Sequence, residues 1–146
     1  LGSGLPLATH TLFHEAGLAQ LDLFAEEGVD LSRVCIGHCD SQPYLDYCLR
    51  IAQRGAWVAF DNIGAQLGRL EERIVWLIKE LVARGHQDQV LLSHDVGQKP
   101  ELSYFGGPGF THLTRKFIPQ LLSAGVPEGV VTKLTVANPK RFLAIS

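Results

Sequence analysis

The chain has 146 residues, of which 46% are hydrophobic, and its formal net charge is -2. These values are typical of one soluble globular domain, which we place at residues 1–146, and they suggest neither nucleic acid nor a membrane as a partner. The longest apolar runs fall short of the ~20 residues that a membrane-spanning helix requires, and the first residues lack the basic start and long apolar core of a secretory signal, so we expect a cytoplasmic protein.

An apolar strand followed by an amphipathic helix recurs along the chain. Predicted strands cover residues 5–11, 34–36, 57–60 and 90–92. Predicted helices cover residues 16–24, 44–54, 67–84 and 113–124, and the glycines that follow them are Gly28, Gly55, Gly85 and Gly125. Glycine is common just after a helix because it adopts the left-handed conformation that ends one. The last segment begins at Pro127 and contains Asn138-Pro139, which predicts two short helices with a break between them.

These four βα units make half of a known closed architecture. A (β/α)8 barrel of the TIM type takes about 250 residues, so this chain supplies roughly half of the strands. A half barrel alone would leave two parallel sheet edges exposed, and such edges pair readily with other strands. We therefore expect either self-association or a complementary amino-terminal half. An open, doubly wound sheet would avoid this problem and is the structural alternative.

Polar, metal-capable or acid-base residues follow each predicted strand. The runs LATHT, VCIGHCD, WVAFDNIG and VLLSHDVG end on His10, His38, Asp61 and Asp95 or just beyond them. In parallel βα architectures, functional side chains gather at the rim formed by the carboxyl ends of the strands. Imidazole and carboxylate groups suit zinc, manganese, cobalt or iron, and two such ions activate water and polarise a carbonyl or phosphoryl group. The pattern therefore indicates a metal-dependent hydrolase.

The same motifs resemble those of a known family. The resemblance rests on five segments in order along the chain: GVDLSRVCIGHCD, YLDYCLRIAQRGAWVAFDNIG, DQVLLSHDVG, GGPGFTHLTRKFIPQLLSAGV and VANPKRFLAI. The chain looks like the second half of a member of the phosphotriesterase family, in the amidohydrolase superfamily, which includes phosphotriesterase-like lactonases and phosphotriesterase-related proteins. The resemblance implies a TIM-type barrel with a binuclear metal centre, in which a metal-activated hydroxide hydrolyses lactone, carboxylester or phosphotriester bonds.

The resemblance also implies roles for particular residues. His10 matches the metal-binding histidine of the family's fifth strand, and His38 matches that of the sixth. Asp95 matches the eighth-strand aspartate, a ligand of the other metal that also takes the proton from the attacking water. The family's first-strand His-x-His pair and its fourth-strand lysine correspond to positions upstream of residue 1, so we expect this chain alone to be incomplete as an enzyme. Zinc is the metal that we expect.

Two positions near these ligands depart from the family pattern. Ser41 stands three residues after His38, where family members commonly have an acid, and Asp40 lies one position earlier. Asn62 follows Asp61 at a position where arginine or histidine is common. We expect Asp61 and Asn62 to contact the substrate, and because asparagine can donate a hydrogen bond but carries no charge, the group that it meets is expected to be neutral. A cap at the strand end is the structural alternative for Asp61.

The glycine-rich loop after the fourth predicted strand is a candidate wall of the substrate pocket. Gly106 and Gly107 would let this loop bend over the site, and a plain turn before the next helix explains them equally well. The charged stretch 71–73 is expected to be a solvated helix face. His14, His86 and His112 are expected at the surface or in loops.

Three hypotheses about function remain open. The first is the hydrolase, acting on a small-molecule ester or lactone, of which this chain is one half. The second is a half-barrel assembly module that dimerises and has no catalytic role, and a stable dimer without turnover would favour it. The third is a phosphate-binding βα protein that uses the glycine-rich loop and the amino terminus of the helix after it. Anion binding that survives the loss of His10 and His38 would favour this third hypothesis.

Overall fold

The computed structural model describes residues 4–11, 15–64 and 70–145, and it places four parallel strands in one sheet. The strands lie in the order β1 (Leu7–Thr9), β2 (Val34–Ile36), β3 (Trp57–Phe60) and β4 (Val90–Leu92). Each strand pairs with the next one along the chain. A doubly wound sheet reverses its strand order at a switch point, whereas a barrel adds each strand beside the last. The observed order therefore supports the half barrel over the open sheet.

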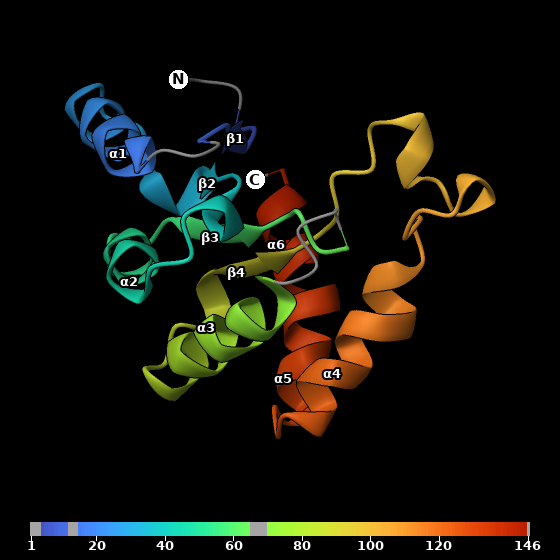
Figure 1. The fold of residues 1–146 in the computed structure, drawn as a ribbon. Coiled ribbons are helices and arrows are strands. Elements are labelled where there is room, and N and C mark those ends of the chain that lie inside the picture. Colours follow the sequence, from blue (N-terminus) through green and yellow to red (C-terminus); the bar gives the residue numbers. More distant parts are fainter. Residues whose placement is uncertain (1–3, 12–14, 65–69, 146) are drawn as a thin grey trace.

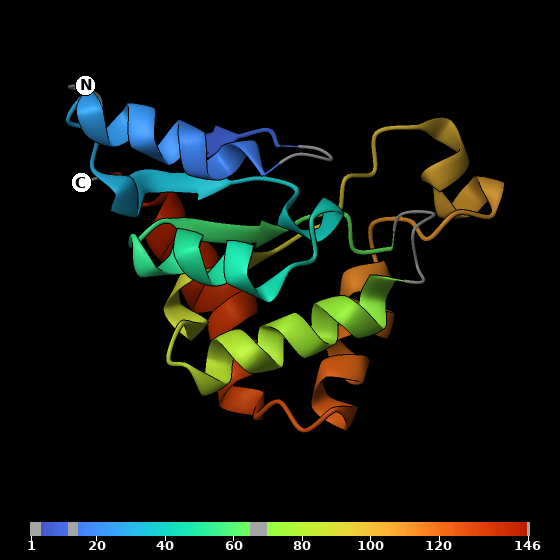
Figure 2. The same ribbon diagram turned by 60° about the vertical axis from the view of Figure 1, so that its left-hand side comes forward.

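Helices cover the two faces of the sheet unequally (Figures 1 and 2). One face carries α1 (Ala16–Glu26), α2 (Leu45–Gln53) and α3 (Glu71–Ala83), and α6 (Asn138–Leu143) lies behind β3 and β4. The remaining helices, α4 (Ile118–Ser123) and α5 (Glu128–Thr132), contact each other. Three of the four predicted strands have the expected bounds, β1 is shorter, and the predicted helical residues 67–69 lie outside the described residues. Among the described helices, none is both long enough and apolar enough to cross a membrane.

Successive residues of the strands face two different apolar layers. Val58 and Phe60 are fully buried in the layer shared with the outer helices. Trp57 and Ala59 point to the opposite side, because side chains alternate along a strand, and there they cluster with Phe142 of α6. The Trp57 and Phe142 rings lie 5.4 Å apart between centroids. This second layer belongs to the face that lines the interior of a closed barrel.

Two helical segments after β4, residues 113–123 and 128–143, each continue through a proline. Wide π-helical turns at Leu113–Phe117 and Lys133–Ala137 lead directly into α4 and α6, whose second residues are Pro119 and Pro139. A proline lacks an N–H, and its ring crowds the carbonyl four residues before it, so a wider turn relieves both problems. Asn138 keeps helical φ and ψ angles of -64° and -52°. The predicted break at Asn138-Pro139 is therefore wrong, because the helix widens there instead of ending.

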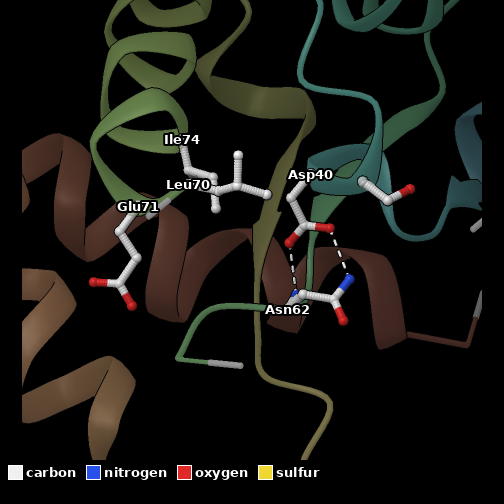
Figure 3. A pocket seen from close by; sticks show the side chains of 6 residues that line it. Asp40, Asn62, Leu70, Glu71 and Ile74 are labelled. Carbon is white, nitrogen blue, oxygen red and sulfur yellow. Dashed lines mark hydrogen bonds between the residues drawn. The ribbon is translucent and has the colours of Figure 1, made fainter. Parts of the chain in front are cut away.

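A small cavity lies where the ends of β2 and β3 meet the start of α3 (Figure 3). Its volume is about 10 Å³, close to the space that one water molecule occupies. The side chains around it come from three elements that are distant in sequence: Asp40, Ser41, Asn62, Leu70, Glu71 and Ile74. The polar residues at these strand ends are therefore packed against the helix layer and not simply displayed to solvent.

Candidate metal centre

The carboxyl ends of β1 and β2 are tied together beside His10 and His38. The N–H of Gly37 donates to the Thr9 carbonyl at 3.1 Å, and Thr11 Oγ1 donates to the Gly37 carbonyl at 2.5 Å. A Cβ atom at residue 37 would lie 2.2 Å from the Thr9 oxygen, so only glycine permits this approach. The close contact brings the residues that follow the two strands, His10 and His38, side by side.

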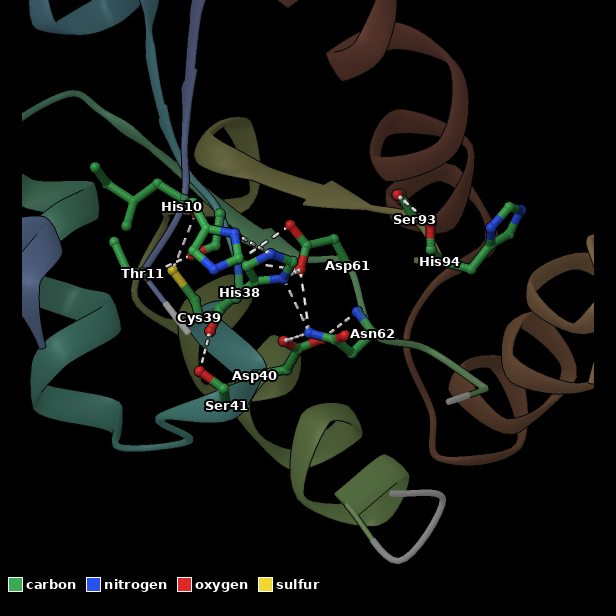
Figure 4. A network of polar contacts seen from close by, with 12 residues as sticks. His10, Thr11, His38, Cys39, Asp40, Ser41, Asp61, Asn62, Ser93 and His94 are labelled. Carbon is green, nitrogen blue, oxygen red and sulfur yellow. Dashed lines mark hydrogen bonds and ion pairs between the residues drawn. The ribbon is translucent and has the colours of Figure 1, made fainter. Parts of the chain in front are cut away.

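The two imidazole rings meet at the rim of the sheet (Figure 4). His38 Nε2 lies 3.0 Å from His10 Nδ1, and the ring planes cross at 82°. At this separation two ring nitrogens either share a proton or direct both lone pairs at a cation. The side chain of His38 is only 11% exposed, whereas His10 is exposed.

Asp61, which follows β3, holds His38 from the rear. Its Oδ1 lies 2.8 Å from His38 Nδ1, and both of its carboxylate oxygens accept the His38 backbone N–H at 3.0 Å. Because an ionised carboxylate can only accept, Nδ1 carries the ring hydrogen and Nε2 keeps its lone pair on the side of His10. The backbone of His38 is left-handed, with φ of 57° and ψ of 34°, a region that residues other than glycine rarely adopt. The bonds to Asp61 help to stabilise this conformation.

These donors fit a divalent transition metal. Imidazole nitrogen is a preferred ligand of zinc and neighbouring metals, and metal-binding histidines commonly donate their second N–H to a carboxylate, as His38 does to Asp61. In the ranges described, one group of three metal-capable side chains has its ligand atoms within 4.8 Å of one another: His38, Asp40 and Asp61. Asp61 is bonded to Nδ1 of His38 and Asp40 is bonded to Asn62, so His38 Nε2 and His10 are left for an ion.

Two carboxyl groups lie close together behind the His38 ring. Burial, followed by the charge of Asp40, raises the pKa of Asp61 to about 6, and the hydrogen bonds from His38 oppose this shift. Burial also raises the pKa of Asp40, against hydrogen bonds from Asn62. Asp40 is 1% exposed, and its two oxygens accept the backbone N–H of Asn62 at 2.6 Å and the side-chain N–H at 2.8 Å. Asp40 therefore fixes the residue that follows Asp61 on the rim.

Asp95, the third predicted metal ligand, lies elsewhere on the rim. Figure 4 shows its neighbour His94 well apart from the His10 and His38 rings. Asp95 is exposed, and the hollow that it lines is shared with Ile63, His94, Val96, Glu101 and Pro108. The structure thus brings His10 and His38 together with Asp61 and leaves Asp95 outside this group. The role of Asp95 as a ligand and proton acceptor stays a prediction.

The glycine-rich loop after β4 is folded onto itself and stands away from the sheet in both fold views (Figures 1 and 2). The N–H of Gly106 donates to Ser103 and that of Gly107 donates to Leu102, both at 3.1 Å. A Cβ atom at Gly107 would lie 2.3 Å from the backbone of Glu101. Because these N–H groups are bonded within the loop, they are not available to cradle a phosphate. A substrate contact by Gly106 or Gly107 stays a prediction.

One buried ion pair differs from the sequence prediction. His112 Nε2 lies 2.7 Å from Glu71 Oε1, and Glu71 is only 7% exposed, so the expectation of a solvated Glu71 is wrong. His112 is half-buried at the end of the loop that follows β4, which agrees with the loop expected for it but not with a fully exposed position. The spacing in the sequence contains the signal, because Glu71 precedes Ile74 and Ile78 by three and seven positions and so lies on the apolar stripe of α3. The other two charged residues of the stretch 71–73 are exposed, as predicted.

With this geometry established, comparison with known proteins decides the family. The model of the phosphotriesterase family matches residues 2–143. The chain belongs to the phosphotriesterase family. The phosphotriesterase homology protein of Escherichia coli (strain K12) is 39% identical over 140 residues, which cover 96% of this chain and 48% of that protein. The resemblance predicted from the strand-end motifs is therefore confirmed.

Other proteins that match this member of the phosphotriesterase family are named as hydrolases or lactonases. N-acetyltaurine hydrolase of Danio rerio is 28% identical over 153 residues, which cover 96% of this chain and 44% of that protein. The crystal structure of a lactonase from Listeria monocytogenes matches 99% of this chain and 46% of its own, with a TM-score of 0.88 and 29% identity. The chain thus spans about half the length of the relatives that it matches. These neighbours and the sequential parallel sheet confirm the predicted half of a TIM-type barrel.

Proposed function

We propose that this chain forms the carboxyl-terminal half of a metal-dependent hydrolase that acts on an ester bond, in a lactone, carboxylester or phosphotriester. The observation that carries the proposal is the approach of His10 Nδ1 and His38 Nε2 to 3.0 Å, with Asp61 bonded to the other nitrogen of His38. Membership of the phosphotriesterase family and the relatives named as lactonase and hydrolase support the same chemistry.

Each residue of the rim has a distinct proposed role. His10 and His38 would hold a divalent ion, and zinc is our first candidate because both ligands are imidazoles. When bound, such an ion polarises the scissile bond and lowers the pKa of a nearby water. Asp61 holds the His38 ring in the orientation that keeps Nε2 facing His10. Asp95 follows the last residue of β4 by three positions and is proposed to accept the proton of the attacking water as the ester bond breaks and the alcohol leaves.

The missing half of the site is proposed to come from a partner. In the described sheet, β1 and β4 each pair on one side only, and the chain covers 48% of the Escherichia coli relative. A second copy of this chain, or a chain that carries the missing strands, would pair with these two edges. Light scattering of the chain alone, and of the chain mixed with the amino-terminal half of the Escherichia coli relative, distinguishes the two. A monomer in both samples would contradict this part of the proposal.

Elemental analysis of the purified chain, after removal of loosely bound ions, tests the metal site. We expect about one zinc ion per chain, and its loss in His10→Ala and in His38→Ala. His86→Ala is the matched control, because His86 precedes β4 at the opposite end of the sheet, and it should retain the metal. A metal-free wild-type chain, or full occupancy in His38→Ala, would contradict the assignment. Hydrolysis of lactones and aryl esters is then measured with and without the partner half.

A further inference from the structure

The side-chain amide of Asn62 forms hydrogen bonds through its nitrogen, while its oxygen has no partner among the described residues. Its Nδ2 donates to Asp40 Oδ1 at 2.8 Å and lies 3.4 Å from Asp61 Oδ1. The same atom lies 3.1 Å from His38 Nδ1. Figure 3 shows the amide nitrogen turned toward Asp40 and the amide oxygen turned away from it. The donor end of Asn62 is therefore directed into the polar network behind His38.

Asp40 fixes the amide in this orientation. Asp40 is 1% exposed, and Asn62 supplies a hydrogen bond to each of its oxygens, one from the side chain and one from the backbone. Rotating the amide about its last bond would place the Asn62 oxygen against a carboxylate oxygen and leave a buried acceptor without a partner. Both effects are unfavourable, so the nitrogen stays on the side of Asp40.

The oxygen of this amide is consequently a fixed acceptor on the rim. Within the part of the chain that the structure describes, no hydrogen bond reaches Asn62 Oδ1, and Asn62 is partly exposed. A carbonyl oxygen can only accept, so its partner must bring an N–H or O–H group. The carboxyl groups of Asp40 and Asp61 lie at the nitrogen end of the same amide, and their charge disfavours an anionic group close to it.

We propose that Asn62 selects substrates that carry a neutral hydrogen-bond donor, an amide N–H or a hydroxyl, next to the bond that is hydrolysed. This preference rests on the proposed hydrolase function, and it makes Asn62 a specificity-determining residue. An arginine at this position would donate to an anion or a carbonyl group. The sequence suggests that Asn62 donates to the substrate, but the contact with Asp40 reverses that direction.

Two pairs of probes test the preference for a donor. For binding, 2-hydroxycyclopentanone carries the donor beside a carbonyl that cannot be hydrolysed, and 2-methoxycyclopentanone lacks it. NMR titration of the zinc-loaded full chain gives both dissociation constants and follows the Asn62 amide signal. We expect the hydroxyketone to bind roughly three- to tenfold more tightly, the contribution of one hydrogen bond, and the ratio to fall to about one in Asn62→Ala. Asn62→Leu, which keeps the volume but not the amide, is measured in parallel.

The controls separate this preference from the hydrolase function. Zinc content shows that the Asn62 variants keep their metal site, and Gln53→Ala, an exposed amide on α2, should keep the wild-type ratio. Equal binding of the two ketones by the wild-type chain, or a preference that persists in both Asn62 variants, would overturn the inference. Turnover of α-hydroxy- and α-methoxy-γ-butyrolactone at equal kcat/KM would also overturn it and leave the hydrolase function standing. A binding preference with no turnover of either lactone, even after the partner half is added, would overturn the hydrolase function and uphold the preference.

Discussion

Nε2 of His112 lies 2.7 Å from Oε1 of Glu71, and this contact joins the start of α3 to the end of the loop that follows β4. Both side chains are largely buried, at 21% and 10% exposed. Gly64 packs against the same contact between Glu71 and His112, the joint, since a Cβ atom at Gly64 would lie 2.8 Å from the His112 ring. Gly64 follows Asn62 by two residues and the loop begins beyond Asp95, so the joint connects two strand ends that carry candidate site residues.

Replacing His112 with alanine is expected to lower the free energy of unfolding by about 2 kcal/mol, because Glu71 is left buried without its partner. Urea unfolding followed by circular dichroism measures this change. Glu72→Ala, an exposed neighbour on the same helix, should change stability by less than about 0.5 kcal/mol. Wild-type stability in His112→Ala, or additive effects of His112→Ala and Glu71→Ala in a double-mutant cycle, would show that the contact contributes nothing.

Gly64→Ala is expected to destabilise the chain more than Gly28→Ala. Both glycines have positive φ, 88° and 72°, so either substitution costs about 1–2 kcal/mol of backbone strain. Only Gly64 also has a ring against it, because nothing lies within 4 Å of a Cβ atom at Gly28. Thermal unfolding of the two variants isolates the steric part. If His112→Ala does not reduce the extra cost of Gly64→Ala, the ring is not its cause.

Asp61→Asn is expected to weaken zinc binding by roughly 10- to 100-fold, since the carboxylate that orients a metal-binding histidine commonly contributes this much. Competition with a chromogenic chelator measures the affinity. Asp46→Asn provides the matched control, because Asp46 lies on α2 with a side chain that is 85% exposed. An affinity in Asp61→Asn equal to that of the control would mean that Asp61 does not support His38.

Asp88 gives the fold a defined dependence on pH. Its Oδ1 lies 2.9 Å from Lys133 Nζ, and this hydrogen bond lowers the pKa of Asp88 below the ordinary 3.8. A lowered folded-state pKa stabilises the fold above the unfolded-state value, and this contribution is lost as the pH falls through the folded-state pKa. Because Asp88 is 37% exposed, we expect Asp88→Asn to cost only about 0.5 kcal/mol at pH 7. Urea midpoints of the two proteins should converge below pH 3.8; a constant difference would contradict this account.

Much of the fold follows from local patterns in the sequence. The strands β2, β3 and β4 are continuous apolar runs, and they have the predicted bounds because both of their faces are covered. The strand β1 is shorter than predicted because pairing with β2 alone defines it, from Leu7 to Thr9. The break expected at Pro139 depends on hydrogen bonding that a π-helical turn changes, and that choice is not visible in residue types.

In the candidate site, too, some features follow from local sequence patterns and others depend on long-range contacts. The positions of His10 and His38 follow from the rule that parallel strands present functional groups at their carboxyl ends. The direction in which Asn62 points depends on Asp40, which lies 22 residues away and is brought there by the sheet. The burial of Glu71 likewise depends on His112, from a loop 41 residues away. The partner residue in each contact has no local signature and is revealed only by the structure, although the place of Glu71 on the apolar stripe of α3 is visible in the sequence.

The left-handed backbone of His38 disfavours a histidine at this position, although the imidazole forms part of the candidate metal site. Glycine adopts φ near 57° without the steric penalty that a Cβ atom brings, and asparagine tolerates it better than most residues. Replacing His38 by glycine would therefore relax the turn after β2 while it removes an imidazole. The proposed metal site therefore favours histidine at this position, whereas the backbone conformation favours glycine.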